Sequence, residues 1–460
     1  MNKSPECCFP GSIKRAFHRP PSAANGSDID PVWMGCSMIA ASRIYGSRLL
    51  KTHRMENIDR RLRLSLDRLK AAWLLASILV AVTACTSDAP FRPVSVEAHK
   101  HPVRSEPAPL PVTGTPVLDL SQAFDLASII PELADKRVVF VGEIHNRYEH
   151  HLTQLEIIRQ LHEIHPRIAI GMEAFQQPFQ HSLDAYIAGD LSERDFLRDS
   201  EYYQRWRFDF RHYAPILRYA REHRIPVIAL NLPAELTRKA GKVGIDGLSE
   251  TEKAKIPQTI DRSDTAYEAR LRDVFDQHPH TDEQSFDRFL DVQLLWDEGM
   301  AKRAAEYLKE NPEAVMVVLA GGGHLAYGSG IPQRLQRRHP VDSAIVLNSW
   351  DAGDLHPDLA DFLLLPERQV LPAAGKMGIM IDDQNGALEI LNCKDDSPCA
   401  AHGIKRGDVI AAINGEPVTD VTDLRLLMWD KKPGDTLNLK IQRKHWLSGV
   451  KEMDVDLELE

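Results

Sequence analysis

The chain has 460 residues, with 56 Lys and Arg against 66 Asp and Glu, and a net charge of −10. An acidic surface repels phosphate backbones, so we expect no nucleic-acid partner. The length exceeds a single domain of ~150 residues, and two or three domains are expected.

The first 84 residues have the pattern of an export leader. An uncharged apolar run, 71–84, follows several arginines and is shorter than the ~20 residues that cross a bilayer as a helix. Met55 precedes these arginines and is a candidate start. The run ends in Val82-Thr83-Ala84-Cys85, which is similar to a bacterial lipobox and predicts lipidation at Cys85. A soluble secreted protein with an incidental cysteine is the alternative.

Residues 85–117 contain many prolines and no sustained apolar period, which predicts an extended tether. Thr86 and Ser87, rather than Asp, follow the cysteine, as in lipoproteins sent to an outer membrane. Without the 13 basic and 6 acidic residues of 1–84, the net charge falls from −10 to −17. We therefore expect an acidic lipoprotein of the cell envelope, held by the outer membrane and facing the periplasm or the surface.

Short β-rich runs alternate with longer helical patterns over 118–366, which predicts an α/β domain with a mostly parallel sheet flanked by helices. Helices are expected at 152–162 and 285–309. The expected strands are 137–141, 168–171, 226–230, 315–320 and 343–347.

Polar side chains follow four of these strands. Parallel sheets bind ligands beyond the carboxyl ends of their strands, so these side chains are expected to face one hollow. The residues are Glu143, His145, Glu173, Asn231 and His324. Glu143 and His145 are two apart, which places them on one face of an extended segment. The alternative is that this pair only caps the next helix.

Three glycines precede His324 in the run 321–332 (GGGHLAYGSGIP). Glycines let main-chain N–H groups approach an anionic group closely, and they also permit positive φ angles for purely structural reasons. Both interpretations remain open from the sequence.

Several ordered motifs between about 118 and 350 resemble the ChaN family. They are GEIH at 142–145, HHLTQL at 150–155, GME at 171–173, YAPI at 213–216, ALNLP at 229–233 and GH at 323–324, continuing to GIP at 330–332. More distantly they resemble Tiki, TraB and erythromycin-esterase-like proteins. The resemblance implies a haem-binding lipoprotein for iron uptake, with haem as cofactor, tyrosinate ligation and a pocket shared in a homodimer.

The tyrosine that would match this ligation is not given by any short motif. Tyr202, Tyr203, Tyr213 and Tyr327 are candidates. Trp206, Phe208 and Phe210 lie among Arg205, Arg207 and Arg211, as apolar cover and propionate partners for haem require. The alternative for 201–213 is an aromatic helix face packed in the core.

Residues 376–460 resemble a PDZ domain of bacterial envelope proteases. The matching stretches are 397–401, 403–410 and 413–415, with a groove helix expected at 421–428. Met377, Gly378, Ile379 and Met380 stand where the peptide-carboxylate loop lies and depart from its commoner G-Φ-G-Φ pattern. An extended peptide or protein C-terminus is the implied partner. A packing or dimerisation module is the alternative.

Cys393 and Cys399 form a disulfide or remain free thiols.

The resemblance to haem-binding proteins favours a binding protein over an enzyme. Two further functions stay open beside haem binding. One is a metal-dependent hydrolase, in which Glu143 or Glu173 is the general base and His145 and His324 bind a divalent metal. The other is a non-catalytic membrane adaptor that recruits partners through the PDZ-like groove.

Overall fold

A computed structural model describes residues 123–277, 283–348, 355–383, 386–445 and 449–460. The predicted leader, the lipidation site at Cys85 and the tether at 85–117 lie outside these ranges. No helix within the described ranges is both long and apolar enough to span a membrane.

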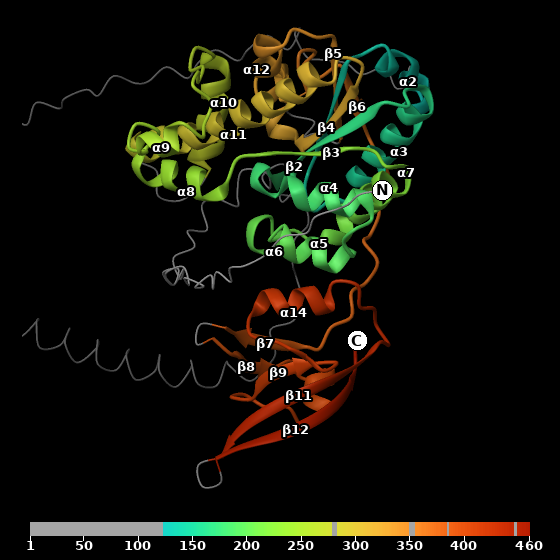
Figure 1. Cartoon of the computed structure of the whole chain (residues 1–460), viewed down its shortest axis with the longest axis vertical. Helices are drawn as coiled ribbons and strands as arrows, with labels where there is room; N and C mark the ends of the chain where they lie inside the picture. The colour runs from blue at the N-terminus through green and yellow to red at the C-terminus, as the bar shows by residue number, and fades with distance from the viewer. Residues whose placement is uncertain (1–122, 278–282, 349–354, 384–385, 446–448) are drawn as a thin grey trace, which may run out of the picture. The chain divides into compact units, whose positions relative to one another are not determined.

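The α/β domain is built on six parallel strands in the spatial order β3-β2-β4-β1-β5-β6 (Figure 1). The strands are β1 (Val138–Glu143), β2 (Ile168–Gln176), β3 (Val227–Asn231), β4 (Val315–Gly321), β5 (Ser343–Asn348) and β6 (Phe362–Leu364). The predicted fold class is confirmed. The five expected strands begin within one residue of the observed ones, and β6 was not predicted.

Helices cover both faces of this sheet. They are α2 (Leu126–Ala134), α3 (Tyr148–Ile164), α4 (Gln180–Ala188), α5 (Glu193–Asp199), α6 (Tyr202–Arg205), α7 (Ala214–His223), α8 (Ala234–Val243), α9 (Glu250–Lys253), α10 (Thr265–Asp276), α11 (Glu283–Glu310) and α12 (Ile331–Arg338). Short 3-10 turns lie at 177–179, 210–212, 322–324 and 326–328. The expected helices 152–162 and 285–309 correspond to α3 and α11.

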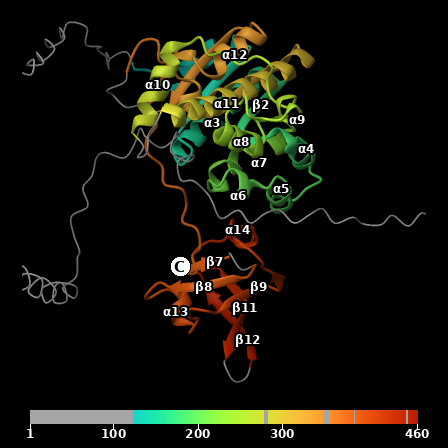
Figure 2. The ribbon, with the colours of Figure 1, turned by 90° about the vertical axis from the view of Figure 1, so that its left-hand side faces the viewer.

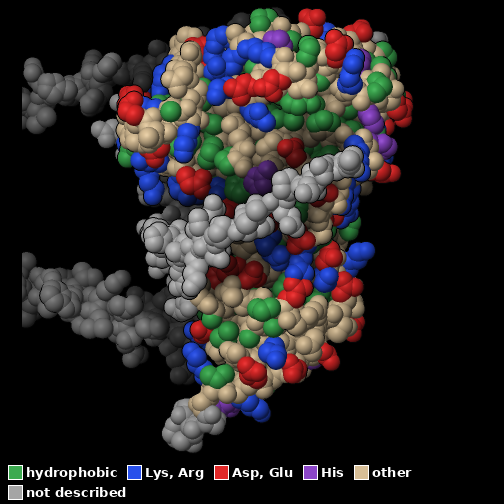
Figure 3. All heavy atoms as spheres, in the orientation of Figure 1, with side chains coloured by type: hydrophobic (Ala, Val, Ile, Leu, Met, Phe, Trp, Pro, Cys, Tyr) green, Lys and Arg blue, Asp and Glu red, His purple; other side chains and the backbone are tan. Residues whose placement is uncertain are grey.

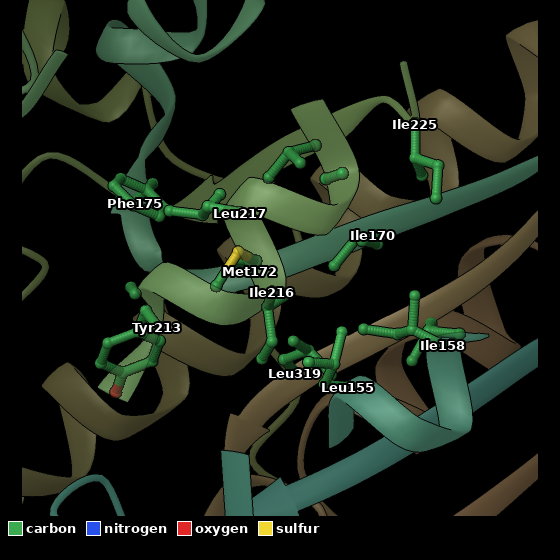
Figure 4. Close-up of a cluster of buried hydrophobic side chains, with 14 of the residues drawn as sticks. Leu155, Ile158, Ile170, Met172, Phe175, Tyr213, Ile216, Leu217, Ile225 and Leu319 are labelled. Carbon is green, nitrogen blue, oxygen red and sulfur yellow. The ribbon is translucent and has the colours of Figure 1, made fainter. Parts of the chain in front are cut away.

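Alternation along the strands divides the core into two clusters. Val139 and Val141 of β1 face α2, α3, α4, α5 and α7, and Figure 4 shows part of this cluster. Val138 and Phe140 face α11 and α12 on the other side. Since successive strand side chains point to opposite faces, a fully apolar strand such as β1 is buried from both sides.

The β-rich domain has a separate antiparallel sheet in the order β12-β11-β9-β8-β7, with β10 paired to β9. Its elements are β7 (Ile379–Asp382), β8 (Leu388–Cys393), α13 (Pro398–Ala401), β9 (Val409–Ile413), β10 (Glu416–Pro417), α14 (Val421–Met428), β11 (Thr436–His445) and β12 (Gly449–Glu458). β11 and β12 form a long hairpin (Figure 2). The expected groove helix is α14.

A disulfide joins Cys393, at the end of β8, to Cys399 in α13, with the two Cα atoms 5.6 Å apart. The pairing resolves the alternatives that the sequence left open. Cys399 is fully buried, and its backbone N–H donates to the carbonyl oxygen of Met377 at 3.1 Å. The disulfide therefore supports the loop that precedes β7.

Replacing both cysteines by serine should lower the free energy of unfolding of the β-rich domain by about 2 kcal/mol, the value expected for so short a closed loop. Thermal unfolding of the mature chain, with and without reductant, measures the difference. The Cys393→Ser/Cys399→Ser variant should not respond to reductant. An equal response of variant and wild type would show that the bond does not stabilise this domain.

Acidic and basic side chains lie interspersed over most of the described surface seen in Figure 3. On this face, side chains of opposite charge are mixed rather than gathered by sign. Interspersed charges favour solubility over the attraction of one large counter-charged partner.

Candidate functional site

The carboxyl ends of neighbouring strands bring four of the predicted polar residues to one edge of the sheet. Glu143 ends β1, Glu173 lies in β2, Asn231 ends β3, and His324 follows β4. All four are buried, with exposed fractions of 4%, 6%, 7% and 8%. Such a group of buried polar side chains needs internal partners.

Glu143 accepts hydrogen bonds on both carboxylate oxygens. His145 Nδ1 and Tyr213 OH each lie 2.8 Å from Oε1, and Gln154 Nε2 lies 2.8 Å from Oε2. Burial by itself raises the pKa of Glu143, but the charge of His151 and the bonds from His145 and Gln154 lower it to about 2. Glu143 is therefore a carboxylate at neutral pH.

His145 is oriented by this carboxylate. Its Nδ1 is held by Glu143, while its Nε2 has no hydrogen-bond partner among the residues that the structure describes. Burial lowers the pKa of His145, but the bond to Glu143 and the charge of Glu173 raise it above the ordinary value. Because the charge of His324 also acts on His145, the side chains of Glu143, His145, Glu173 and His324 form one electrostatic unit.

Three residues of α3 hold the turn after β1, and the sequence-based site missed all three. His150 Nδ1 accepts from the Ile144 N–H at 3.0 Å, and His151 Nε2 bonds the His145 carbonyl at 3.1 Å. Gln154 Nε2 bonds the Val141 carbonyl at 3.1 Å in addition to Glu143. The HHLTQL motif could have indicated these residues, since residues 150 and 154 share one helix face at this spacing.

His324 belongs to a second buried network. Its Nδ1 lies 2.6 Å from Asp297 Oδ1, and Tyr267 OH donates to Asp297 Oδ2 at 2.5 Å. Its Nε2 lies 3.5 Å from Glu173 Oε1. The sequence reasoning missed Asp297 of α11, although an acidic pair inside the apolar run LLWDEGMA was a visible signal.

The glycine run before His324 serves a carboxylate of the protein itself. The N–H of Gly321 donates to Glu173 Oε2 at 2.7 Å. The close approach that the glycines permit thus positions Glu173. Asn231 completes this corner, because its Nδ2 donates to the Glu173 carbonyl oxygen at 3.2 Å.

The His324 network gives a pH dependence of stability. Burial lowers the pKa of His324, but the charges of Glu173 and Asp297 raise it to about 9, against an ordinary value of 6.5. A raised histidine pKa stabilises the fold fully below pH 6.5, and this contribution is lost as pH rises through about 9. We expect wild type to lose on the order of 3 kcal/mol across this window.

Urea unfolding of the mature chain between pH 6 and pH 10 measures this loss. His324→Gln should remove the pH-dependent part, whereas the exposed His223→Gln should retain it. A pH profile of His324→Gln that is identical to the wild-type profile would assign the dependence to other groups.

Aromatic side chains of the segment 201–213 close over His145. The ring centroids of Trp206 and Phe208 lie 4.8 Å and 4.9 Å from that of His145. The segment is not one helix face, as the core-packing alternative required, because it consists of short α6, a turn and a 3-10 turn. Some of its rings do pack in the core, among them Phe210 and Tyr213.

The four candidate tyrosines differ in their surroundings. Tyr202, Tyr203 and Tyr213 are buried in the first core cluster, and burial raises the pKa of each. Tyr213 donates to Glu143, and Figure 4 shows it among the apolar side chains of that cluster. Tyr327 packs in the second cluster, with the guanidinium carbon of Arg270 at 4.4 Å from its ring centroid. Tyrosinate is thus disfavoured at the three buried positions.

A metal site formed by His145 and His324 was also predicted. Within the described ranges, no group of three or more His, Cys, Asp and Glu side chains is arranged to hold a metal ion. The short contacts of both histidines are instead with carboxylates.

Comparison with protein families agrees with this architecture. Residues 129–335 match the family described as "Haem-binding uptake, Tiki superfamily, ChaN", and residues 375–458 match the PDZ domain. The chain carries a ChaN-like domain followed by a PDZ domain. The resemblances that the motifs suggested are confirmed for both domains.

Individual relatives match parts of the chain. Protein RETICULATA-RELATED 5, chloroplastic, of Arabidopsis thaliana is 25% identical over 308 residues, which cover 63% of this chain and 38% of that protein. A probable periplasmic serine endoprotease DegP-like of Rhizobium meliloti (strain 1021) is 32% identical over 142 residues, which cover 30% of this chain and 24% of that protein. The chain spans well under half of either relative's length.

Among solved structures, "Cofacial heme binding to ChaN of Campylobacter jejuni" matches with 18% identity and a TM-score of 0.45, covering 53% of this chain and 92% of that one. This similarity is too distant for a residue-by-residue transfer.

The donor set of the ChaN-like domain fits a haem through His145. A histidine whose Nδ1 bonds a carboxylate is fixed in its tautomer and becomes a more basic ligand at Nε2. Trp206 and Phe208 supply apolar rings beside it. Because His145 is only 4% exposed, ligation of a haem iron by this residue would require the side chains around it to move.

Proposed function

We propose that the chain is an envelope lipoprotein whose ChaN-like domain binds haem and whose PDZ domain binds an extended peptide. The observation that carries the haem half is the carboxylate-bonded His145, with its free Nε2, beside two aromatic rings. Haem would supply the redox and ligand chemistry of its iron. The protein's part is to orient His145, exclude water around it and cover the ring system.

Haemin titration tests this half of the proposal. The mature chain with Cys85→Ser, which removes the lipidation site, should give a Soret band that saturates at micromolar haemin. Absence of binding at that concentration would contradict the proposal. Histidine ligation is proposed in place of tyrosinate at Tyr202, Tyr203 or Tyr213, because burial raises the pKa of these three phenols and favours their protonated form.

The PDZ domain supports the peptide half through an open strand. β7 lies at the edge of the sheet and pairs with β8, which is the position to which an added peptide strand binds. Ile379 and Ile381 of β7 share a cluster with Val421 and Met428 of α14, which gives the groove apolar walls. Met380 is 61% exposed beside them.

We propose that the loop before β7 receives the peptide carboxylate, and Gly378 sets the backbone of this loop. Its φ is 70°, and a Cβ there would collide with the Ser397 side chain. Peptides with a free C-terminal carboxylate should therefore bind the mature chain more tightly than their amidated forms, and Gly378→Val should abolish the difference. Equal affinity of free and amidated peptides would leave the groove without terminal selectivity.

Lipid attachment is the third element of the proposal. It is supported by the lipobox-like Val82-Thr83-Ala84-Cys85 and the proline-rich stretch after it. Metabolic labelling with an alkyne fatty acid should mark the wild type and not Cys85→Ser, and fractionation should move the variant from the membrane to the soluble envelope. Equal labelling of both would remove this element.

A second candidate function is hydrolysis, which the Asp297–His324 contact favours. A histidine bonded to a buried carboxylate and facing Glu173 is suited to transfer protons. Ester and peptide substrates, assayed with and without added Mn²⁺ or Zn²⁺, together with elemental analysis of the purified chain, test it. Lack of turnover under all these conditions would exclude this candidate for those substrates.

A further inference from the structure

The disulfide between Cys393 and Cys399 closes a short ring of the PDZ domain, and this ring bonds the loop before β7. Six positions separate the two cysteines. The N–H of Lys394 donates to the Gly378 carbonyl oxygen at 2.8 Å, and the N–H of Cys399 donates to the Met377 carbonyl oxygen at 3.1 Å. The ring therefore holds the first two residues of this loop through both of its own ends.

Ser397 adds a side-chain contact from inside the ring. Its side chain is buried, and its Oγ lies 2.6 Å from the Lys394 carbonyl oxygen and 3.4 Å from the Gly378 carbonyl oxygen. A Cβ at Gly378 would collide with this side chain, so the loop and the ring are in direct contact. Because they are packed this closely, a change in the ring conformation is transmitted to Gly378.

The two cysteines differ in their burial. Cys399 is fully buried in the core cluster that also contains Met377. Cys393 is only partly buried and lies opposite Ile379 where β8 pairs with β7. A thiolate gains access to a disulfide at its more exposed sulfur. Cys393 is therefore the position at which a reductant attacks this bond.

We propose that the redox state of this cysteine pair controls the affinity of the PDZ groove for a peptide C-terminus. The inference rests on the proposed peptide-binding function, in which the loop before β7 receives the terminal carboxylate. The closed ring fixes this loop before the peptide arrives, so that ordering it is not a cost of binding. In the dithiol form, residues 394–398 gain conformational freedom that binding must remove again.

The switching step is a thiol–disulfide exchange with a dithiol reductant. A thiolate of the reductant attacks Cys393 Sγ, and Cys399 leaves as a thiolate that takes up a proton. The second thiol of the reductant then attacks the mixed disulfide and releases Cys393, which is protonated in turn. The protein gains two thiols, and the reductant is oxidised to its own disulfide. The groove is thus active in an oxidising compartment and weakened where dithiols act.

Peptide titrations of the oxidised and the reduced chain test this switch. The mature chain with Cys85→Ser retains Cys393 and Cys399 as its cysteines. Four fluorescein-labelled heptapeptides GSGSXSX, with Val, Leu, Ile or Phe at both X positions, are compared as free acids and as amides by fluorescence polarisation. Excess dithiothreitol should expose two thiols per chain and weaken binding of the free acids by about 5- to 30-fold, the factor for ordering roughly one further residue. Binding of the amides should change little.

Two variants without the bond control for other effects of the reductant. Cys393→Ser/Cys399→Ser and Cys393→Ala/Cys399→Ala should bind the free acids like reduced wild type, with or without dithiothreitol. The alanine variant is needed because Cys399 is buried, and a hydroxyl group there loses its hydrogen bonds to water. Circular dichroism shows that each chain is folded, and reoxidation of reduced wild type with glutathione disulfide should restore its affinity.

The outcomes separate this inference from the proposed function. If oxidised wild type prefers free acids and reduction leaves their affinity unchanged, the redox control is excluded while peptide binding stands. If oxidised wild type binds none of the four peptides, both proposals fall. If reduction weakens acids and amides equally, or if the folded chain exposes no thiols to dithiothreitol, the disulfide does not act through the carboxylate loop and the inference is excluded.

Discussion

His145→Ala should remove most of the haemin affinity of the mature chain and the Soret shift that accompanies binding. The side chain offers Nε2 to the site, and Glu143 fixes its orientation through Nδ1. Glu143→Gln keeps the imidazole and changes only its partner, so it should weaken haemin binding by about 10- to 100-fold. The loss in His145→Ala should exceed that range. Spectrophotometric titration gives both affinities.

Two further variants decide between His145 and Tyr213 as the ligand. Tyr213→Phe removes the phenol that donates to Glu143 and should keep the Soret band of wild type. His223→Ala removes an exposed histidine from the end of α7 and controls for nonspecific haemin binding. Retained binding in His145→Ala, combined with its loss in Tyr213→Phe, would replace our assignment with tyrosinate ligation.

The sequence predicted the strand-derived half of the site because a parallel sheet leaves little freedom there. Once β1, β2 and β4 are adjacent, residues just past their carboxyl ends lie close together whatever their separation in sequence. Glu173 and His324 are 151 positions apart, and their side chains come within 3.5 Å. The apolar run of β1 and the existence of α3 were also readable from local sequence, although α3 spans Tyr148–Ile164 and is longer than the expected 152–162.

The helix-derived half could not be predicted in this way. Asp297 and Tyr267 reach His324 from α11 and α10, and the rotation of each helix depends on packing against the sheet. Asp297 and Glu298 are adjacent on α11, yet one bonds His324 and the other bonds Arg337. No periodicity in the sequence assigns such neighbours to different partners.

The positive φ angles in the segment 201–213 could not be predicted from the sequence either. Glu201 and Arg207 adopt positive φ angles of 50° and 69°, although neither is a glycine or an asparagine. A helical pattern over 201–213 therefore breaks into short pieces, and Trp206 and Phe208 turn toward His145. The glycine run before His324 is a case in which the sequence did predict a local property. Its composition predicted close approach to an anion, but only the fold shows that Glu173 is one such partner.

Glu298→Gln should lower the free energy of unfolding of the ChaN-like domain by about 3–5 kcal/mol, the cost of breaking a buried ion pair from one side. The Glu298 side chain is fully buried, and its carboxylate bonds Arg337 Nη2 at 2.5 Å and also bonds Arg338. It accepts the Asp261 N–H at 2.9 Å and lies 3.4 Å from Arg334 Nε. The substituted amide would be neutral, and the three guanidinium groups around it would lose their shared counter-charge.

The same substitution should also disturb the His324 network, because Glu298 joins α12 and the loop at Asp261 to the turn of α11 that carries Asp297. Urea unfolding monitored by tryptophan fluorescence measures the stability loss. Glu313→Gln breaks an ion pair in which both partners are about 70% exposed and should cost under about 1 kcal/mol. If the two variants lose equal stability, the Glu298 cluster is not a structural anchor of this domain.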